Sequence, residues 1–288
     1  QLLELSALCL RCEVGDLLTD ESCWNIFVAC YNLYHITTDD KSFGLLRDSA
    51  GNTLAHIVLM LFSRPRVGGK QTPFGRVAGV SPALEGGQEE EPWPSLDGAN
   101  DDGASQGPTK RGGGRDSGTA EQEGVLVKLM RFLSLLSDPR SNGSAECVLS
   151  LSLINIALEA GGADLGRIPS LVRVMRGDLC KHLLQNSQTD DLDVLSLTLR
   201  VVFNLFNSIK DHLKVQLEVF LTSVHLRVLD GSSYGPEQQE LALESLLEFT
   251  REPALMTDVY INYDCDVQCT NLFETICHSL SSHALPRD

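Results

Sequence analysis

Apolar residues recur at intervals of three and four positions along most of this chain, and that period constrains its fold more than any other feature. Seven stripes of roughly 10 to 18 residues follow one another between 124 and 288, joined by short polar connections. No stretch alternates apolar and polar residues as a half-buried strand does. The sequence therefore predicts an all-α protein.

The predicted helices begin and end at capping and helix-breaking residues. One stripe runs over 192–209 behind a pair of aspartates, and two further stripes lie within 1–62. Helices of this length with short connections favour stacked helical hairpins, as in armadillo or HEAT arrays, although no sequence repeat is evident. The expected caps and stops are, in chain order, Asp20, Ser63, Asp138-Pro139, Gly161-Gly162, Pro169-Ser170, Asp190 or Asp191, and Pro253.

The segment 63–123 differs in composition from the rest of the chain. It holds 13 of the 24 glycines and 6 of the 11 prolines, and its apolar periodicity disappears. Such a segment cannot bury enough surface to offset its ordering entropy, which predicts a long disordered insertion. The expected organisation is helices in 1–62, a Gly/Pro-rich acidic linker over 63–123, and a helical domain over 124–288.

The formal net charge of −16 argues against nucleic acid as a partner, because such binding gains affinity by neutralising phosphates with Lys and Arg. The longest purely apolar run, Ile57–Phe62, is far shorter than the roughly 20 residues that span a bilayer, so no transmembrane segment is expected. The chain begins at Gln1 without a methionine or a signal-peptide pattern, and we expect it to be part of a longer protein.

The nine cysteines do not form a disulfide framework, and reduced thiols are expected. Cys265, Cys269, Cys277 and His278 are the candidate metal ligands. Cys269 and Cys277 are eight residues apart on one predicted helical stripe, about 12 Å along the axis, so buried core thiols are favoured over zinc. Packing is likewise favoured for Cys9 and Cys12, which have the spacing of a redox dithiol.

Motifs of catalysis are missing from the sequence. It has no Gly-x-Ser-x-Gly elbow, His-Glu-x-x-His motif or phosphate-binding Gly-x-x-x-x-Gly-Lys-Ser/Thr loop. His182, His212 and His225 fall on separate predicted helices, where satisfied or exposed histidines are the expected state. We therefore expect no enzyme activity and no cofactor from this chain.

A short segment near the C-terminal end, 260–266, combines two carboxylates, an amide and two phenols just before a stripe over 269–280. Its oxygens can cap a helix expected to begin near Val267, where carboxylates also suit the helix dipole. One capping residue would suffice, so the additional polar residues also indicate a contact with another element or with a partner. Both interpretations stay open. We call the last five residues of this segment the acidic box: Asn262, Tyr263, Asp264, Cys265 and Asp266.

The acidic box, followed by a Leu-Phe-Glu helix, resembles the signature of the "homology upstream of Sec7" (HUS) region. That region belongs to the large guanine-nucleotide exchange factors of Arf GTPases, in the Golgi brefeldin-A-resistance and GNOM branch. The stretch 45–54 resembles the helix that closes their N-terminal dimerisation and cyclophilin-binding (DCB) domain, here without its start. The stretches 178–183, 199–218 and 253–258 are similar to HUS helices.

The resemblance implies a cytoplasmic protein, peripheral on Golgi membranes, that acts in vesicle transport. The catalytic Sec7 domain, which would engage the Arf GTPase, is expected after Asp288. This chain is then regulatory: its DCB-like and HUS-like parts are expected to bind each other, to support a homodimer and to take part in recruitment by Golgi membrane partners. The acidic box is the expected contact between or beside those parts.

Two other functions remain open from the residues. A generic α-solenoid scaffold would hold unrelated partners and have no effect on Arf. A cysteine-dependent enzyme would require a thiol of low pKa.

Overall fold

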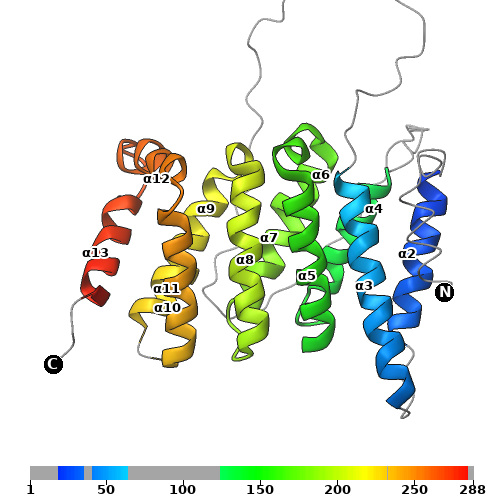
Figure 1. The fold of residues 1–288 in the computed structure, drawn as a ribbon. Helices are drawn as coiled ribbons and strands as arrows, with labels where there is room; N and C mark the ends of the chain where they lie inside the picture. Colours follow the sequence, from blue (N-terminus) through cyan, green and yellow to red (C-terminus); the bar gives the residue numbers. More distant parts are fainter. Residues whose placement is uncertain (1–18, 36–40, 64–123, 232, 285–288) are drawn as a thin grey trace, which may run out of the picture. The chain divides into compact units, whose positions relative to one another are not determined.

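The computed structural model describes residues 19–35, 41–63, 124–231 and 233–284, without the side chains of 41–43. Within these ranges every regular element is a helix (Figure 1). The all-α prediction is confirmed. The predicted linker over 63–123 lies outside the described residues except for Ser63, and so do Cys9 and Cys12.

The α-helices are α2 (Asp20–Tyr34), α3 (Lys41–Ser63), α4 (Val125–Leu136), α5 (Ser144–Gly161), α6 (Pro169–Val174), α7 (Cys180–Asn186), α8 (Leu192–Ile209), α9 (Lys214–Phe220), α10 (Arg227–Asp230), α11 (Pro236–Thr250), α12 (Pro253–Val259) and α13 (Leu272–Ala284). Two 3₁₀ turns, η2 (Gly162–Arg167) and η4 (Lys210–His212), follow α5 and α8. Three π-helical turns, η3 (Met175–Leu179), η5 (Leu221–Leu226) and η6 (Tyr260–Asp264), join α6 to α7, join α9 to α10 and extend α12.

Local chemistry explains most helix boundaries. The carboxylate of Asp191 accepts the backbone N–H groups of Asp193 and Val194, which caps α8 as predicted. Prolines occupy the first positions of α6, α11 and α12, where a missing N–H costs nothing. Gly162 ends α5 with a φ of 48°, a conformation that glycine adopts without a Cβ clash.

The predicted cap of α2 is wrong by one residue. Thr19, not Asp20, accepts the N–H of Ser22 at 3.2 Å. Asp20 is the first residue inside the helix, and its carboxylate bonds to a different helix, as described below.

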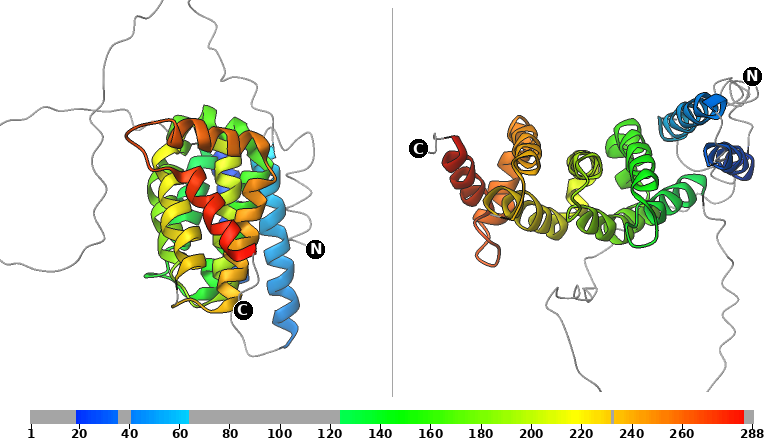
Figure 2. Two further views of the ribbon diagram at one scale, coloured as in Figure 1. Left: turned by 90° about the vertical axis from the view of Figure 1, so that its left-hand side faces the viewer. Right: turned by 90° about the horizontal axis from the view of Figure 1, so that it is seen from below.

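The helices form two layers of antiparallel pairs (Figures 1 and 2). Helices α3, α5, α8 and α11 lie side by side in one layer, while α4, α6–α7 and α9–α10 form the other. One cluster of buried residues runs through the described part of both layers and includes Phe27, Leu133, Phe206 and Phe249. The predicted stack of helical hairpins is therefore confirmed.

Polar contacts between successive helical hairpins recur at a nearly constant sequence separation, although the sequence shows no repeated motif. Most of them join residues 47 to 54 positions apart, which is close to the length of one helical pair. The residue types that make these contacts differ from one helical pair to the next, so they do not form a sequence repeat. The contacts are Ser134–His182, Ser137–Asn186, Ser144–Asp191, Asn155–Asn204, Leu158–Ser208, Thr189–Gln238, Lys210–Asp258, Lys214–Tyr263, Lys214–Asp266, Glu218–Thr270, Asp230–Ser279 and Leu229–His283.

Two stretches of the described chain are long and apolar enough to cross a membrane by length and composition. They are Ser144–Arg167 and Leu192–His212, each with a mean hydropathy of 1.4 over its best window. About half of each window is buried, because α5 and α8 pack against each other in the middle of the array. Their apolar composition is that of central core helices.

Helices from both sides of the insertion belong to one compact unit. Helix α3 packs against α5, and α2 packs against α3 and α4. The proposed boundaries between a DCB-like part, a linker and a HUS-like part stay a prediction.

Candidate functional site

The acidic box is itself helical, which the sequence interpretation did not foresee. Residues Asn262 to Asp264 belong to η6, the π-helical end of α12, and a turn over 265–271 then leads to α13. The helix expected near Val267 begins at Leu272 instead. The box is therefore the corner between α12 and α13, and a π turn is a frequent feature of functional sites.

Tyr263 is the buried anchor of this corner, with 2% of its surface exposed. Its hydroxyl donates a short hydrogen bond to the backbone carbonyl of Lys214, the first residue of α9. Burial, reinforced by the nearby Glu218, raises the pKa of the phenol, so it stays protonated and able to donate. Tyr263 thus ties η6 to the preceding helical pair.

Asp264 caps α13 although it lies eight residues before the start of that helix in the sequence. Its two oxygens accept the backbone N–H groups of Phe273 at 2.8 Å and Glu274 at 3.0 Å, both in the first turn of the helix. These are orphan donors of a helix N-terminus, where a carboxylate also meets the favourable end of the helix dipole. The predicted capping role is correct for Asp264, although the helix it caps begins later.

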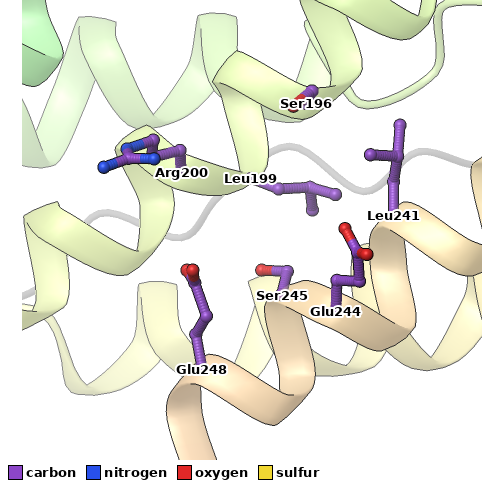
Figure 3. Close-up of a pocket in the computed structure, with 7 residues that line it drawn as sticks. All are labelled: Ser196, Leu199, Arg200, Leu241, Glu244, Ser245 and Glu248. Atoms are coloured by element: carbon purple, nitrogen blue, oxygen red, sulfur yellow. The ribbon is translucent and has the colours of Figure 1, made fainter.

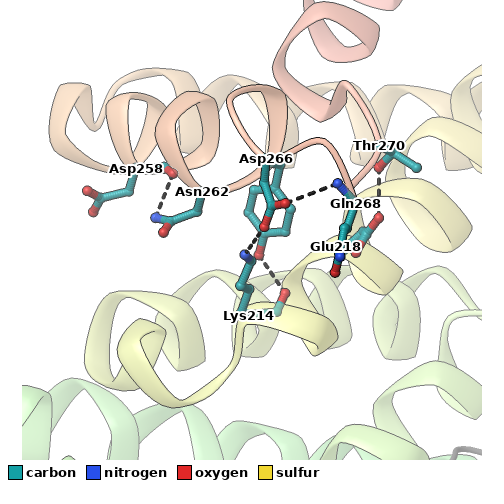
Figure 4. A network of polar contacts seen from close by, with 8 residues as sticks. Lys214, Glu218, Asp258, Asn262, Asp266, Gln268 and Thr270 are labelled. Atoms are coloured by element: carbon teal, nitrogen blue, oxygen red, sulfur yellow. Dashed lines mark hydrogen bonds and ion pairs between the residues drawn. The ribbon is translucent and has the colours of Figure 1, made fainter.

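Asp266 forms the polar edge of the corner (Figure 4). One oxygen accepts the N–H of Gln268 at 3.0 Å and the other contacts Lys214 Nζ at 3.0 Å. The Gln268 N–H and the Lys214 ammonium lower the pKa of this carboxyl. Two flanking contacts, Lys210 with Asp258 and Thr270 with Glu218, extend the seam between α9 and the corner.

The remaining box residues are exposed. Asn262 is exposed and donates only to the carbonyl of Asp258 within its own helix, and Cys265 is exposed. Beside them, Tyr260 is 50% exposed and Ile261 is 56% exposed. The box therefore has an inner half that holds the fold and an outer half that is available for contact. We call Tyr263, Asp264 and Asp266 with Lys214 and Glu218 the C-terminal junction.

A second junction lies at the other end of the array, where α2 meets α4. The carboxylate of Asp20 accepts the N–H of Val125, the first residue of α4, at 2.9 Å. The ring of Phe132 receives Trp24, Phe27 and Tyr31 at centroid distances of 5.7, 5.8 and 5.1 Å, all in edge-on geometry. We call these five side chains, Asp20, Trp24, Phe27, Tyr31 and Phe132, the N-terminal junction.

Lys128 of α4 reinforces this junction from outside. Its ammonium lies 4.6 Å from the Trp24 ring centroid and 3.9 Å from a Glu21 oxygen. The N-terminal junction thus joins residues separated by the whole insertion. Among the described residues, the hydrogen bonds and ion pairs of the box lead to α9, α12, α13 and the turn before α13, and none leads to α2 or α4.

The expectation of buried thiols in the Cys265, Cys269 and Cys277 set is wrong. Cys265 and Cys277 are exposed and Cys269 is partly exposed, because the last helix begins after Cys269 and turns Cys277 outward. No group of potential ligands able to hold a metal occurs among the described residues. Elsewhere, burial raises the pKa of Cys30, Cys147 and Cys180, that of Cys180 to about 12, which is the opposite of an activated nucleophile.

The three histidines are satisfied or exposed, as predicted. His182 Nδ1 lies 2.7 Å from the carbonyl of Ser134, and His212 is exposed. His225 is fully buried between the carbonyl of Phe220 and the hydroxyl of Ser245. Burial lowers its pKa to about 4, so the ring is neutral at physiological pH.

A family model describes much of this architecture. The Mon2/Sec7/BIG1-like HUS domain matches residues 125–272, which is more than half of the chain and runs from the start of α4 to the start of α13. The chain belongs to the Sec7-like HUS family. The acidic box lies at the C-terminal end of the matched HUS segment, and the N-terminal junction joins the first HUS helix to the helices before it.

Individual relatives of this HUS chain are exchange factors by name. The Golgi-specific brefeldin A-resistance guanine nucleotide exchange factor 1 homolog of Caenorhabditis elegans is 38% identical over 167 residues, 55% of this chain and 8% of that protein. The Arabidopsis thaliana ARF guanine-nucleotide exchange factor GNOM is 37% identical over 141 residues, 48% of this chain and 10% of that protein.

A third relative aligns with almost the whole chain. The Arabidopsis thaliana ARF guanine-nucleotide exchange factor GNL1 is 26% identical over an alignment of 335 residues, which covers 99% of this chain and 23% of that protein. The chain thus spans less than a quarter of the length of each of these relatives. The HUS chain is similar to a regulatory stretch of much longer Arf exchange factors.

Sequence reasoning missed the partners of the box. Lys210, Lys214 and Glu218 lie on the connection and helix that precede the corner by 48 to 52 residues. In the sequence these three residues are four positions apart, and so are Asp258, Asn262 and Asp266, although neither set lies on a single helix. The two opposite-charge pairs at the same spacing, Lys210 with Asp258 and Lys214 with Asp266, are the signal that could have found them.

Proposed function

We propose that this chain is the non-catalytic regulatory and interaction region of a Sec7-type Arf guanine-nucleotide exchange factor. The observation that carries the proposal is the HUS match over 125–272, which ends at the acidic box. The alignment of 99% of the chain with one named exchange factor supports extending the proposal to the helices before the insertion. In this proposal a Sec7 domain follows Asp288 and acts on an Arf GTPase at Golgi membranes.

The two junctions suggest how such a region works. The N-terminal junction is the proposed intramolecular contact between the DCB-like helices and the HUS domain, because aromatic packing and the Asp20 bond join them across the insertion. At the other end, the inner half of the box keeps the corner rigid. The outer half, with Asn262, Cys265 and the exposed Tyr260 and Ile261, is the proposed surface for self-association or for a recruiting partner.

The first test is to sequence the transcript beyond the Asp288 codon. A Sec7 domain encoded downstream supports the proposal. A stop codon or an unrelated domain there contradicts it and favours the generic helical scaffold.

The second test uses the full-length protein in a GDP-release assay with an Arf GTPase on Golgi-like liposomes. We expect the 288-residue chain alone to leave GDP release at its intrinsic rate. In the full-length protein, Ile261→Asp should change membrane recruitment or self-association without lowering thermal stability, because the side chain is exposed. Asn32→Asp, an exposed change on α2, is the control. Unchanged recruitment and self-association would refute the role of the outer half of the box.

A further inference from the structure

A surface cavity between α8 and α11 shows how acidic groups of this array are balanced by the chain itself (Figure 3). The cavity measures about 150 Å³, and the carboxylates of Glu244 and Glu248 share its lining with the guanidinium of Arg200. Arg200 also reaches Glu159 of α5 at 3.5 Å. The carboxylates of this seam thus have a cation beside them, and we assign no ligand to the cavity.

The turn between α4 and α5 has a more acidic environment. Burial raises the pKa of the Cys147 thiol at the start of α5, and nearby carboxylates raise it further. Those carboxylates belong to Glu146, Asp138 and Asp191. The turn itself contributes one cation, Arg140. A further negative charge in this turn would therefore be unfavourable.

Asn142 supplies the donor that closes this turn. Its side-chain Nδ2 donates to the carbonyl of Leu135 at 3.0 Å and to the carbonyl of Asp138 at 3.2 Å. One carbonyl lies in the last turn of α4 and the other directly after that helix. A carboxamide nitrogen donates, whereas the oxygens of a carboxylate only accept. The position therefore suits asparagine and excludes an ionised aspartate in the same role.

Gly143 follows Asn142 as the N-cap of α5 and is exposed. A Cβ at this position would lie 2.9 Å from a carboxylate oxygen of Glu146, so any other residue would first have to displace that side chain. Among the described residues, the backbone N–H of Gly143 donates no hydrogen bond. An accessible backbone nitrogen without a neighbouring side chain thus stands next to the carboxamide of Asn142.

This pair is unique in the chain, because Asn142 is the one asparagine that a glycine follows. The residue after each of the others is Ile, Leu, Thr, Asp, Ser or Tyr, whose side chain hinders access to the backbone nitrogen. Most of the other asparagines that the structure describes also lie within helices, where the following N–H is held in a helical hydrogen bond.

From this arrangement we propose that Asn142 is a site of spontaneous deamidation, and that the reaction removes the cap at the end of α4. The Gly143 nitrogen loses its proton and attacks Cγ of Asn142, which closes a succinimide ring. The bond from Cγ to Nδ2 breaks, and the side-chain nitrogen leaves as ammonia after taking up that proton. Water then opens the ring to aspartate or isoaspartate. The reaction needs neither an oxidant nor a cofactor.

The product cannot replace Asn142 in the turn. A carboxylate has no proton to donate, so the carbonyls of Leu135 and Asp138 lose this donor and face a negative charge instead. Helix α4 also carries Phe132 of the N-terminal junction, so loss of the cap weakens the helix that holds α2. The inference goes beyond the proposed function, since it does not depend on Arf or on the acidic box.

The first test incubates the 288-residue chain at neutral pH and follows it by tryptic peptide mapping with mass spectrometry. Cleavage after Arg140 and Arg167 places Asn142 and Asn155 in one peptide, so the second asparagine is an internal control. Asn155 lies within α5 and is followed by isoleucine. We expect aspartate and isoaspartate to accumulate at position 142 well before they do at position 155. Conversion at 142 that is no faster than at 155 would overturn the proposal.

The second test introduces the product directly. Asn142→Asp should lower the midpoint of thermal unfolding by about 2–4 °C, the shift expected when a hydrogen-bonded cap is lost. Asn52→Asp adds the same charge at an exposed position of α3 and should leave the midpoint almost unchanged. Hydrogen exchange should also become faster at the amides of Ser141 and Asn142, which donate to the Asp138 carbonyl.

Equal midpoints for Asn142→Asp and Asn52→Asp would refute the link between deamidation and the cap of α4. If Asn142→Asp does not fold, the deamidated fraction of the wild-type chain, separated by ion exchange, gives the same comparison. Neither test involves Arf exchange, so its outcome is independent of the proposed function.

Discussion

The two junctions of this HUS chain each hold helices of neighbouring pairs together, but they do so with different interactions. At the N-terminal junction, α2 is held to α4 by aromatic rings, and one carboxylate bonds the first amide of α4. At the C-terminal junction a single buried ring is surrounded by hydrogen bonds and ion pairs to a helix 49 residues earlier. The first contact rests mainly on burial and the second mainly on directed polar bonds. The difference predicts that they respond differently to truncation, to hydroxyl removal and to pH.

The largest effects should come from removing the buried ring of each junction. Phe27→Ala and Tyr263→Ala should each lower the free energy of unfolding by about 3–5 kcal/mol, because both rings are almost fully buried and leave a cavity. Urea unfolding measures the loss. Asn32→Ala, on the exposed face of α2, is the control and should change stability by less than about 0.5 kcal/mol. A loss below about 1 kcal/mol for either ring variant would contradict the packing described here.

The two capping carboxylates should rank next. Asp264→Ala should cost about 1–2 kcal/mol, because two amides of α13 lose their acceptor, and Asp20→Ala should cost less because one amide of α4 does. Hydrogen exchange of the Phe273, Glu274 and Val125 amides locates each loss. A larger loss of stability for Asp20→Ala than for Asp264→Ala would show that the number of capped amides does not explain the difference between the two junctions.

Removing only the hydroxyl of Tyr263 sharpens the contrast further. Tyr263→Phe keeps the ring and loses the bond to the Lys214 carbonyl, so it should cost about 0.5–1.5 kcal/mol. The matched change at the other junction, Tyr31→Phe, should cost less, since among the described residues that hydroxyl makes no hydrogen bond and the contacts of Tyr31 are those of its ring. Equal losses of stability for the two variants in thermal unfolding would show that the hydrogen bond from Tyr263 does not contribute measurably to stability.

The smallest effect should be a dependence on pH at the C-terminal junction. The folded pKa of Asp266 lies below its ordinary value of 3.8, so its contribution is complete above that value and is lost as the pH falls through the lowered pKa. The stability difference between the wild type and Asp266→Asn should therefore shrink between pH 6 and pH 3.

The comparison with Asp266→Asn separates this effect from that of His225. The folded pKa of His225, about 4, lies below its ordinary 6.5, so both proteins lose the same stability between those values as the unfolded chain binds a proton. Urea unfolding of both proteins at pH 6 and pH 3 measures the difference. A difference that stays constant would mean that Asp266 acts without its charge.

Most helices could be predicted from the sequence. The stripes that became α4 and α5 end where Asp138-Pro139 and Gly161-Gly162 indicate, and α8 begins directly after Asp191, because these signals act on their own backbone neighbours. The resemblance carried by the acidic box also led to the HUS family. Local interactions and a characteristic motif can be recognised from the sequence before the tertiary structure is known.

The roles of the box side chains could not be predicted in the same way. Asp264 caps a helix that begins eight residues later than itself, after a turn whose length no local rule sets, and Asp20 bonds an amide 105 residues away. The sequence left open whether the box contacts another element or a partner. Tyr263 contacts another element and is buried, because η6 directs it toward α9, whereas Asn262 and Cys265 are exposed.

The sequence by itself therefore determined the helices, the class of fold and the family, since periodicity, caps and the box are properties of neighbouring residues. Only the tertiary structure decided which side chains meet. It placed Lys214 beside Asp266 of the box and brought Phe132 to the α2 rings. The physical reason is that these contacts join residues about 49 or more than 100 positions apart, and their geometry exists only after the helical pairs have stacked.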